Sequence, residues 1–172
     1  MILKKLFPLA LVVLLAVLLV GCNFATPKEI DVVYVSYRDE TGRIGYEQKV
    51  DLKEKQLWKY SSTAYDPNRI VPSGPMAENE GFVFVRDLDD DKIASFRREA
   101  ERYGFANWAD EYINPNVCDG DRWDIAIGFS DGTTKTVVGS NAYPTTWDKM
   151  FMAFEKLAGE RILLFESDYY GY

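Results

Sequence analysis

Hydrophobic and polar residues alternate along much of the chain after residue 30, and the pattern predicts two groups of strands, each followed by one helix. Short runs rich in β-branched and aromatic residues, bounded by turn residues, indicate strands. We expect strands at 31–38, 44–50, 55–60, 81–86, 122–130, 133–139 and 161–165. The run 81–86 is continuously apolar, which predicts a strand buried on both faces.

Apolar residues at spacings of three and four predict the two helices. The first follows the acidic run 87–91, whose Asp side chains suit a helix N-terminus, and Gly104 is placed to end it. The second is expected to open with a capping box of Thr145 and Asp148 and to end at Gly159. The apolar positions are Ile93, Phe96, Ala100 and Tyr103 in the first helix, and Trp147, Met150, Phe151, Phe154 and Leu157 in the second.

Turn signals join the strands into hairpins. Asp131-Gly132 lies between two alternating runs, and Gly42 lies in a longer turn over 39–43. The stretches 61–80 and 105–121 carry no regular period and are expected to be loops. The pattern as a whole predicts a single α+β domain over 31–172, with a mainly antiparallel sheet and two amphipathic helices packed on one face.

The N-terminus has the organisation of a secretory signal peptide. Lys4 and Lys5 precede an apolar run from Leu6 to Val20. As a helix this run would extend roughly 22 Å, less than the ~30 Å hydrocarbon core of a bilayer. A permanent transmembrane anchor is therefore the weaker interpretation. An ordinary signal peptide, or a short signal anchor, with a coincidental Cys22 remains an alternative to the lipoprotein interpretation given next.

Leu19-Val20-Gly21-Cys22 resembles the lipobox of bacterial lipoproteins. The resemblance implies cleavage before Cys22, diacylglycerylation of its thiol and often acylation of the new amine. It divides the chain into a signal peptide at 1–21, a lipidated tether at 22–30 and the globular domain. Two or three acyl chains hold a protein on a membrane far more firmly than one. The expected location is extracytoplasmic, on the cell membrane or, in a cell with two membranes, on the outer membrane.

Charge and composition narrow the classes of function. The chain has 27 acidic residues against 20 basic ones, two of them in the signal peptide, and it has no histidine. The acidic balance argues against nucleic acid as a partner. The absence of histidine removes His-dependent catalytic triads and His-containing zinc sites. With Cys22 carrying lipid, Cys118 has no partner in the chain for a disulfide. We expect it to be a small buried side chain, in preference to a reactive or intermolecular thiol.

A second resemblance covers about 40 residues near the C-terminus. The runs RWDIAIGFSDGT and GSNAYP, followed by the helix that opens near Trp147, are similar to a segment of small, uncharacterised bacterial lipoproteins. This resemblance implies a type of domain and no activity.

Few residues stand out as a site. Asp119 and Asp121, with Asp124 nearby, offer oxygen ligands for calcium, although turn formation explains the first two equally. Trp108 and Tyr112 lie in a predicted loop and, with 61–80, are candidates for contact with a sugar or peptide ligand.

No residue pattern identifies a reaction, and no cofactor is expected. The leading hypothesis is a lipid-anchored, non-enzymatic domain that binds an envelope protein or glycan. The alternative is a cell-wall or glycan-active enzyme that uses acidic residues, since many carboxylates are present and no two are singled out. A purely structural lipoprotein without a discrete ligand is a third possibility.

Overall fold

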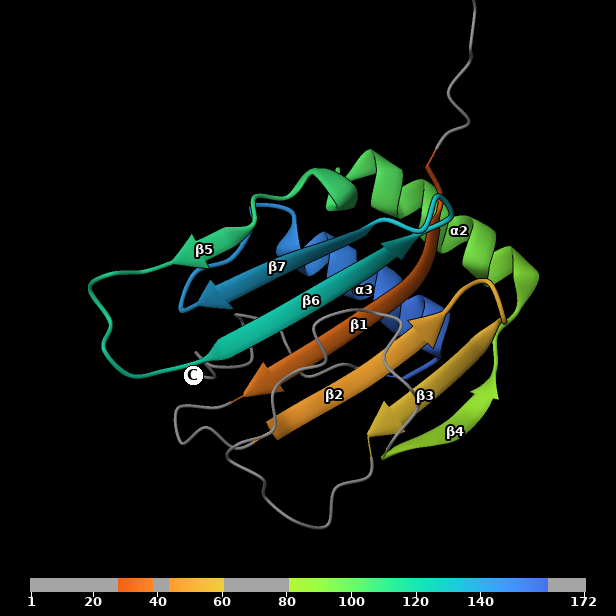
Figure 1. The fold of residues 1–172 in the computed structure, drawn as a ribbon, viewed down its shortest axis with the longest axis horizontal. Helices are drawn as coiled ribbons and strands as arrows, with labels where there is room; N and C mark the ends of the chain where they lie inside the picture. The colour runs from red at the N-terminus through yellow and green to blue at the C-terminus, as the bar shows by residue number, and fades with distance from the viewer. Residues whose placement is uncertain (1–27, 39–43, 61–80, 161–172) are drawn as a thin grey trace, which may run out of the picture.

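The computed structural model describes residues 28–38, 44–60 and 81–160, which form a seven-stranded sheet with two helices packed on one face (Figure 1). The prediction of an α+β fold with a mainly antiparallel sheet is confirmed. The strands are β1 (Ile30–Arg38), β2 (Ile44–Asp51), β3 (Gln56–Tyr60), β4 (Phe82–Asp87), β5 (Glu111–Ile113), β6 (Arg122–Phe129) and β7 (Thr134–Ser140). The helices are α2 (Asp90–Arg102), the short 3₁₀ helix η1 (Phe105–Asn107) and α3 (Trp147–Ala158).

The strands lie in the order β4-β3-β2-β1-β6-β7-β5. All neighbours are antiparallel except β5 and β7, which are parallel. The central strand β1 pairs with β2, its neighbour in sequence, and with β6, which follows much later in the chain. The strand β1 therefore joins the two predicted groups of strands into one sheet.

The main core lies between the sheet and the helices. Alternate residues of β1 and β6, including Val33 and Ile127, point toward the helices and are fully buried. Phe96 of α2 and Phe154 of α3 meet over the sheet with ring centroids 4.6 Å apart. Trp123 of β6 and Trp147 of α3 also belong to this core, as the sequence pattern predicts.

The ends of α2 follow local chemistry closely. The carboxylate of Asp89 accepts hydrogen bonds from the backbone N–H groups of Asp91 and Lys92. Gly104 follows the helix with φ of +64°, a conformation that glycine adopts without steric cost. Acidic capping and the glycine stop, both expected from the sequence, are confirmed.

The start of α3 differs from the expected capping box of Thr145 and Asp148. The helix begins at Trp147, and its N-cap residue is Thr146, whose side chain makes no capping hydrogen bond. The Thr146 hydroxyl instead donates to the carbonyl of Tyr103 and accepts from the indole N–H of Trp108. Tertiary hydrogen bonds thus replace the local cap.

Two further elements differ from the sequence pattern. The strand β4 was expected to be buried on both faces, but it lies at an edge of the sheet, with Val83 54% and Phe84 44% exposed. Apolar content alone does not place a strand in the centre of a sheet, so this prediction is wrong. The short strand β5 lies in a stretch expected to be irregular, because three residues are too few to show a period.

Several predictions fall on residues outside the described part of the chain. These are the signal peptide and Cys22, the turn around Gly42, the loop 61–80 and the final strand at 161–165. Among the residues that the structure describes, no helix is long and apolar enough to span a membrane.

Candidate functional site

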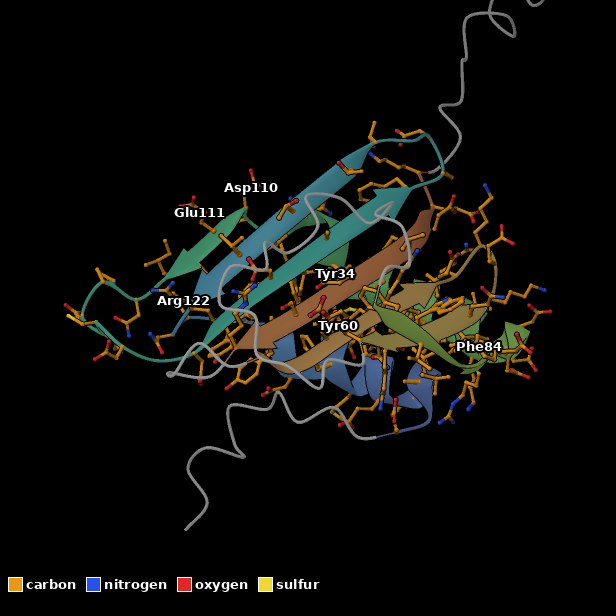
Figure 2. The ribbon with its side chains drawn as sticks, turned by 60° about the horizontal axis from the view of Figure 1, so that its bottom comes forward. Tyr34, Tyr60, Phe84, Asp110, Glu111 and Arg122 are labelled. Atoms are coloured by element: carbon orange, nitrogen blue, oxygen red, sulfur yellow. The ribbon has the colours of Figure 1, made fainter. Side chains whose placement is uncertain are left out.

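The sheet curls strongly on the side turned away from α2 and α3, which we call the second face. The rings of Tyr34 on β1 and Phe82 on β4 lie 5.9 Å apart, centroid to centroid. The strands β2 and β3 separate these two strands, so a flat sheet would hold them about 14 Å apart. The edge of the sheet at β4 therefore bends over the second face, as Figure 2 shows from below.

Aromatic side chains line the bent part of this face. Tyr60 and Phe82 meet edge to face at 5.7 Å, and Trp58 and Phe84 meet in the same way at 5.5 Å. We call these four residues the aromatic wall. Phe84 is well exposed, whereas Trp58, Tyr60 and Phe82 are partly exposed. The wall therefore offers ring surface to a molecule at this end of the sheet.

Three polar residues lie directly opposite one another on neighbouring strands of the second face. Ser36 of β1 is paired with Glu47 of β2 on one side and with Asp124 of β6 on the other. Residues directly opposite on adjacent strands share a face, so their side chains form a line that we call the polar row. The line continues through Val138 of β7 to Glu111 of β5.

The hydroxyl of Ser36 is the unusual member of the polar row. The residue is completely buried, and its Oγ has no hydrogen-bond partner. Most buried polar atoms in folded proteins have a partner, because an unpaired hydroxyl loses its hydrogen bonds to water on burial. That loss costs about 1–3 kcal/mol. The hydroxyl of Ser36 therefore has hydrogen-bonding capacity left for a further group.

The two carboxylates of the polar row have different surroundings. Glu47 is buried, with 6% of its surface exposed, and it accepts a hydrogen bond from the hydroxyl of Tyr34. Asp124 is half-buried and has no hydrogen bond or ion pair with another residue in the described ranges. Burial raises the pKa of the Asp124 carboxyl above its ordinary value, and this effect exceeds the opposing influence of the Arg38 and Arg122 guanidinium groups.

Basic residues flank the polar row on both sides. Arg38 and Arg122 lie opposite each other, two residues beyond Ser36 on β1 and two residues before Asp124 on β6. Lys49 lies opposite Tyr34, two residues from the row in the other direction. Exposure increases along the row, from buried Ser36 through half-buried Asp124 to exposed Glu111. The end of the row that is open to solvent is therefore the β5 end, marked by Glu111 in Figure 2.

The polar row lies far from residues 28–30, where the described part of the chain begins. The backbone N–H of Glu29 donates to the hydroxyl of Ser130, and the Glu29 carboxylate pairs with Arg97 at 2.8 Å. Ser36 is six residues beyond Ile30 on β1, which corresponds to about 20 Å of extended strand. The start of the described chain and the polar row thus lie at opposite ends of β1.

The aromatic residues singled out by the sequence lie in or against the main core. Trp108 is 5% exposed, its ring stacks on Trp147 at 5.9 Å, and its indole N–H donates to Thr146. Tyr112 is half-buried against Trp123, and its hydroxyl accepts from the backbone N–H of Ala109. Ligand contact by Trp108 and Tyr112 stays a prediction, and packing explains the position of both rings.

The acidic candidates for calcium do not come together. Asp119 is exposed on a loop, Asp121 is buried, and Asp124 lies on the second face of the sheet. Within the described ranges, no three acidic or cysteine side chains are grouped as a metal site would require. The expectation that Cys118 is buried is wrong: it is exposed, because the loop that carries it projects beyond the edge of the sheet.

Sequence reasoning did not single out Ser36 or Glu47. Each is one polar residue in an alternating strand, and its spacing carries no chemical signal. Only the register of β1 between β2 and β6 brings the two residues into line with Asp124.

Comparisons of the chain with protein-family models, with curated proteins and with solved structures found no match. The possible chemistry of the second face therefore follows from its own residues. The unpaired hydroxyl of Ser36 can donate or accept one further hydrogen bond, and the ionised carboxylate of Asp124 can accept several. This arrangement can bind a molecule that donates hydrogen bonds.

Proposed function

We propose that the protein is a lipid-anchored extracytoplasmic domain that binds a ligand, without chemical conversion, at the polar row on the second face of its sheet. The observation that supports the proposal is the buried, unpartnered hydroxyl of Ser36 beside the half-buried carboxylate of Asp124. Both groups gain hydrogen bonds only from a molecule that is not part of the described chain. A fold that keeps such groups desolvated is disposed to bind a partner there.

The expected anchor is consistent with this arrangement. Acyl chains on Cys22 would hold the tether at the membrane, and the tether enters the domain beside Arg97 and Ser130. The polar row lies about 20 Å farther along β1. A tethered domain would in this way present its binding site away from the bilayer.

The anchor is tested by mass spectrometry of the N-terminal peptide and by fractionation of cells. The proposal expects a peptide that begins at an acylated Cys22 and a protein found with membranes. A Cys22→Ala variant should lose both the acyl mass and the membrane association. An uncleaved, unlipidated N-terminus would overturn the anchor.

Binding is tested by hydrogen exchange on the acylated protein in nanodiscs, with glycan, lipid and protein fractions of the cell envelope added in turn. One fraction should slow amide exchange in β1 and β6. The effect should be lost in Asp124→Ala and retained in Thr134→Ala, an exposed position on the same face near the tether. Equal protection in both variants, or none in the wild type, would contradict the proposed site.

A second candidate function is glycan cleavage by acidic residues. Glu47 and Asp124 lie two strands apart, about 10 Å between backbones, and they flank one hydroxyl. A general acid requires a raised pKa, and burial raises that of Asp124. Release of reducing ends from a cell-wall glycan, lost in Asp124→Asn and in Glu47→Gln, would establish this function. If the protein binds the glycan without turnover, the second candidate is rejected and the proposed binding function is retained.

A further inference from the structure

We infer that the ligand of the polar row is a neutral, hydroxyl-rich glycan. This inference rests on the proposed binding function of the second face and specifies the chemical class of its ligand.

The unsatisfied groups require a ligand with hydrogen-bond donors. Asp124 is acceptor-only when ionised, and the hydroxyl of Ser36 beside it can both donate and accept. A sugar hydroxyl meets both demands, because it donates to a carboxylate while accepting from a neighbouring hydroxyl. Adjacent hydroxyl groups on one sugar ring can therefore engage Asp124 and Ser36 together.

Immediately around the polar row the charges of the described residues balance, whereas Asp51 and Asp87 lie on the same face nearer the start of β1. The carboxylates of Glu47, Asp124 and Glu111 stand against the cations Lys49, Arg38 and Arg122 on the same face. Binding sites for strongly charged ligands carry an excess of the opposite charge, which raises both the rate and the strength of association. The described residues next to the polar row provide no such excess for an anion or a cation, and this local balance favours a neutral polar ligand.

The aromatic wall supplies the apolar contact that a polar row lacks. Phe82 touches both Tyr60 and Tyr34, and Tyr34 in turn hydrogen-bonds Glu47, so the wall adjoins one end of the row. Aromatic side chains combine a large apolar surface with, in Tyr, a polar group. A sugar ring has polar edges and apolar C–H faces, so a chain of several rings can contact the row at Asp124 and the wall at the other end of the row. An extended peptide also offers donors and acceptors, but its backbone has no apolar ring face to lie against the aromatic wall.

The experiment uses three tetrasaccharides of similar length and different charge, titrated calorimetrically into the acylated protein in nanodiscs. They are the neutral N-acetylglucosamine tetramer, its cationic deacetylated form and anionic tetragalacturonate. The neutral tetramer should bind at least tenfold more tightly than either charged one. Its affinity should fall at least tenfold in Asp124→Ala and about fivefold in Ser36→Ala, in keeping with the loss of a charged and of a neutral hydrogen bond.

Two further variants complete the design. Tyr60→Ala should weaken binding about fivefold through loss of ring contact, and Thr134→Ala, which removes an exposed hydroxyl from the same face, should leave affinity unchanged. Circular dichroism of each variant verifies that the fold is retained. Equal loss of affinity in Thr134→Ala would contradict a site at the polar row.

The outcomes separate this inference from the function on which it rests. Tighter binding of a charged tetramer, or binding of an extended peptide or of lipid at the row in place of sugar, would overturn the glycan assignment and leave the binding site standing. The glycan assignment would also be overturned, with the binding site left standing, if no tetramer bound and only the envelope protein or lipid fraction protected β1 and β6. An absence of protection by any fraction would overturn both.

Discussion

Removing the hydroxyl of Ser36 should stabilise the protein. The side chain is fully buried and its Oγ has no partner, so the folded state bears the desolvation cost of an unmade hydrogen bond, about 1–3 kcal/mol. Ser36→Ala removes one oxygen atom and leaves a very small void, which offsets part of the gain. We expect the free energy of unfolding to rise by about 1 kcal/mol, or roughly 3–5 °C in Tm.

A hydroxyl with two partners provides the matched control. Thr146 donates to the carbonyl of Tyr103 at 3.1 Å and accepts from the indole N–H of Trp108 at 3.0 Å. Thr146→Val keeps the shape of the side chain and leaves both partners unsatisfied, so stability should fall by about 2 kcal/mol. The two variants therefore change stability in opposite directions.

Urea unfolding followed by tryptophan fluorescence measures both effects, with the slope m verifying that the unfolded states are comparable. A fall in stability of Ser36→Ala, comparable with that of Thr146→Val, would refute the reasoning. It would mean that a group outside the described chain, such as an ordered water molecule, already bonds the hydroxyl in the folded state. The same variant should bind ligand less well, so stability and binding oppose each other at this residue.

Three further changes test other parts of the structure. Gly139→Ala should lower the free energy of unfolding by about 3 kcal/mol or prevent folding, because a Cβ there would lie 1.9 Å from the indole ring of Trp123. Thermal unfolding measures this loss, and an unchanged Tm would contradict the close packing of Gly139 on Trp123. Asp124→Asn should change the pH dependence of stability. Burial raises the pKa of Asp124 above its ordinary 3.8, so the folded state holds this proton more tightly and stability falls as pH rises from about 4 through the raised pKa. Urea titrations between pH 4 and 7 should show a smaller fall in the variant, and an identical profile would count against the cause given. Arg97→Ala removes the ion pair with Glu29 and a bond to the carbonyl of Ile30, and it should destabilise the domain by about 1 kcal/mol, with faster amide exchange confined to the start of β1.

Local physical chemistry made the elements of this fold predictable. The alternation from Trp123 to Phe129 places every second residue of β6 in the core, and Asp131-Gly132 turns the chain into β7 with Gly132 at φ of +79°. Asp89 begins α2 and Gly159 ends α3 for reasons that depend on a few neighbouring residues. The fold class followed from these elements, because amphipathic helices and half-apolar strands have few ways to bury their apolar faces together.

The tertiary structure decided which of these elements are neighbours. The sequence could not place β4 at an edge of the sheet. An apolar run indicates that a strand is buried, but it does not specify which strands lie beside it. The position of Trp108 is a similar case. It directly follows the 3₁₀ helix η1, and its ring packs against Trp147 of α3 in the core.

The polar row depends entirely on such non-local pairing. Ser36, Glu47 and Asp124 are ordinary polar positions in three strands, and a shift of one residue in register would turn each strand's side chains to the opposite face. Burial of Ser36 and the raised pKa of Asp124 arise only once β1 lies between β2 and β6 and the sheet curls toward Phe82. The sequence by itself thus indicated most of the elements and several of their ends, and it predicts an anchor at Cys22. The pairing of distant strands decided the candidate site, because burial and charge at a residue depend on neighbours that its own stretch of chain does not specify.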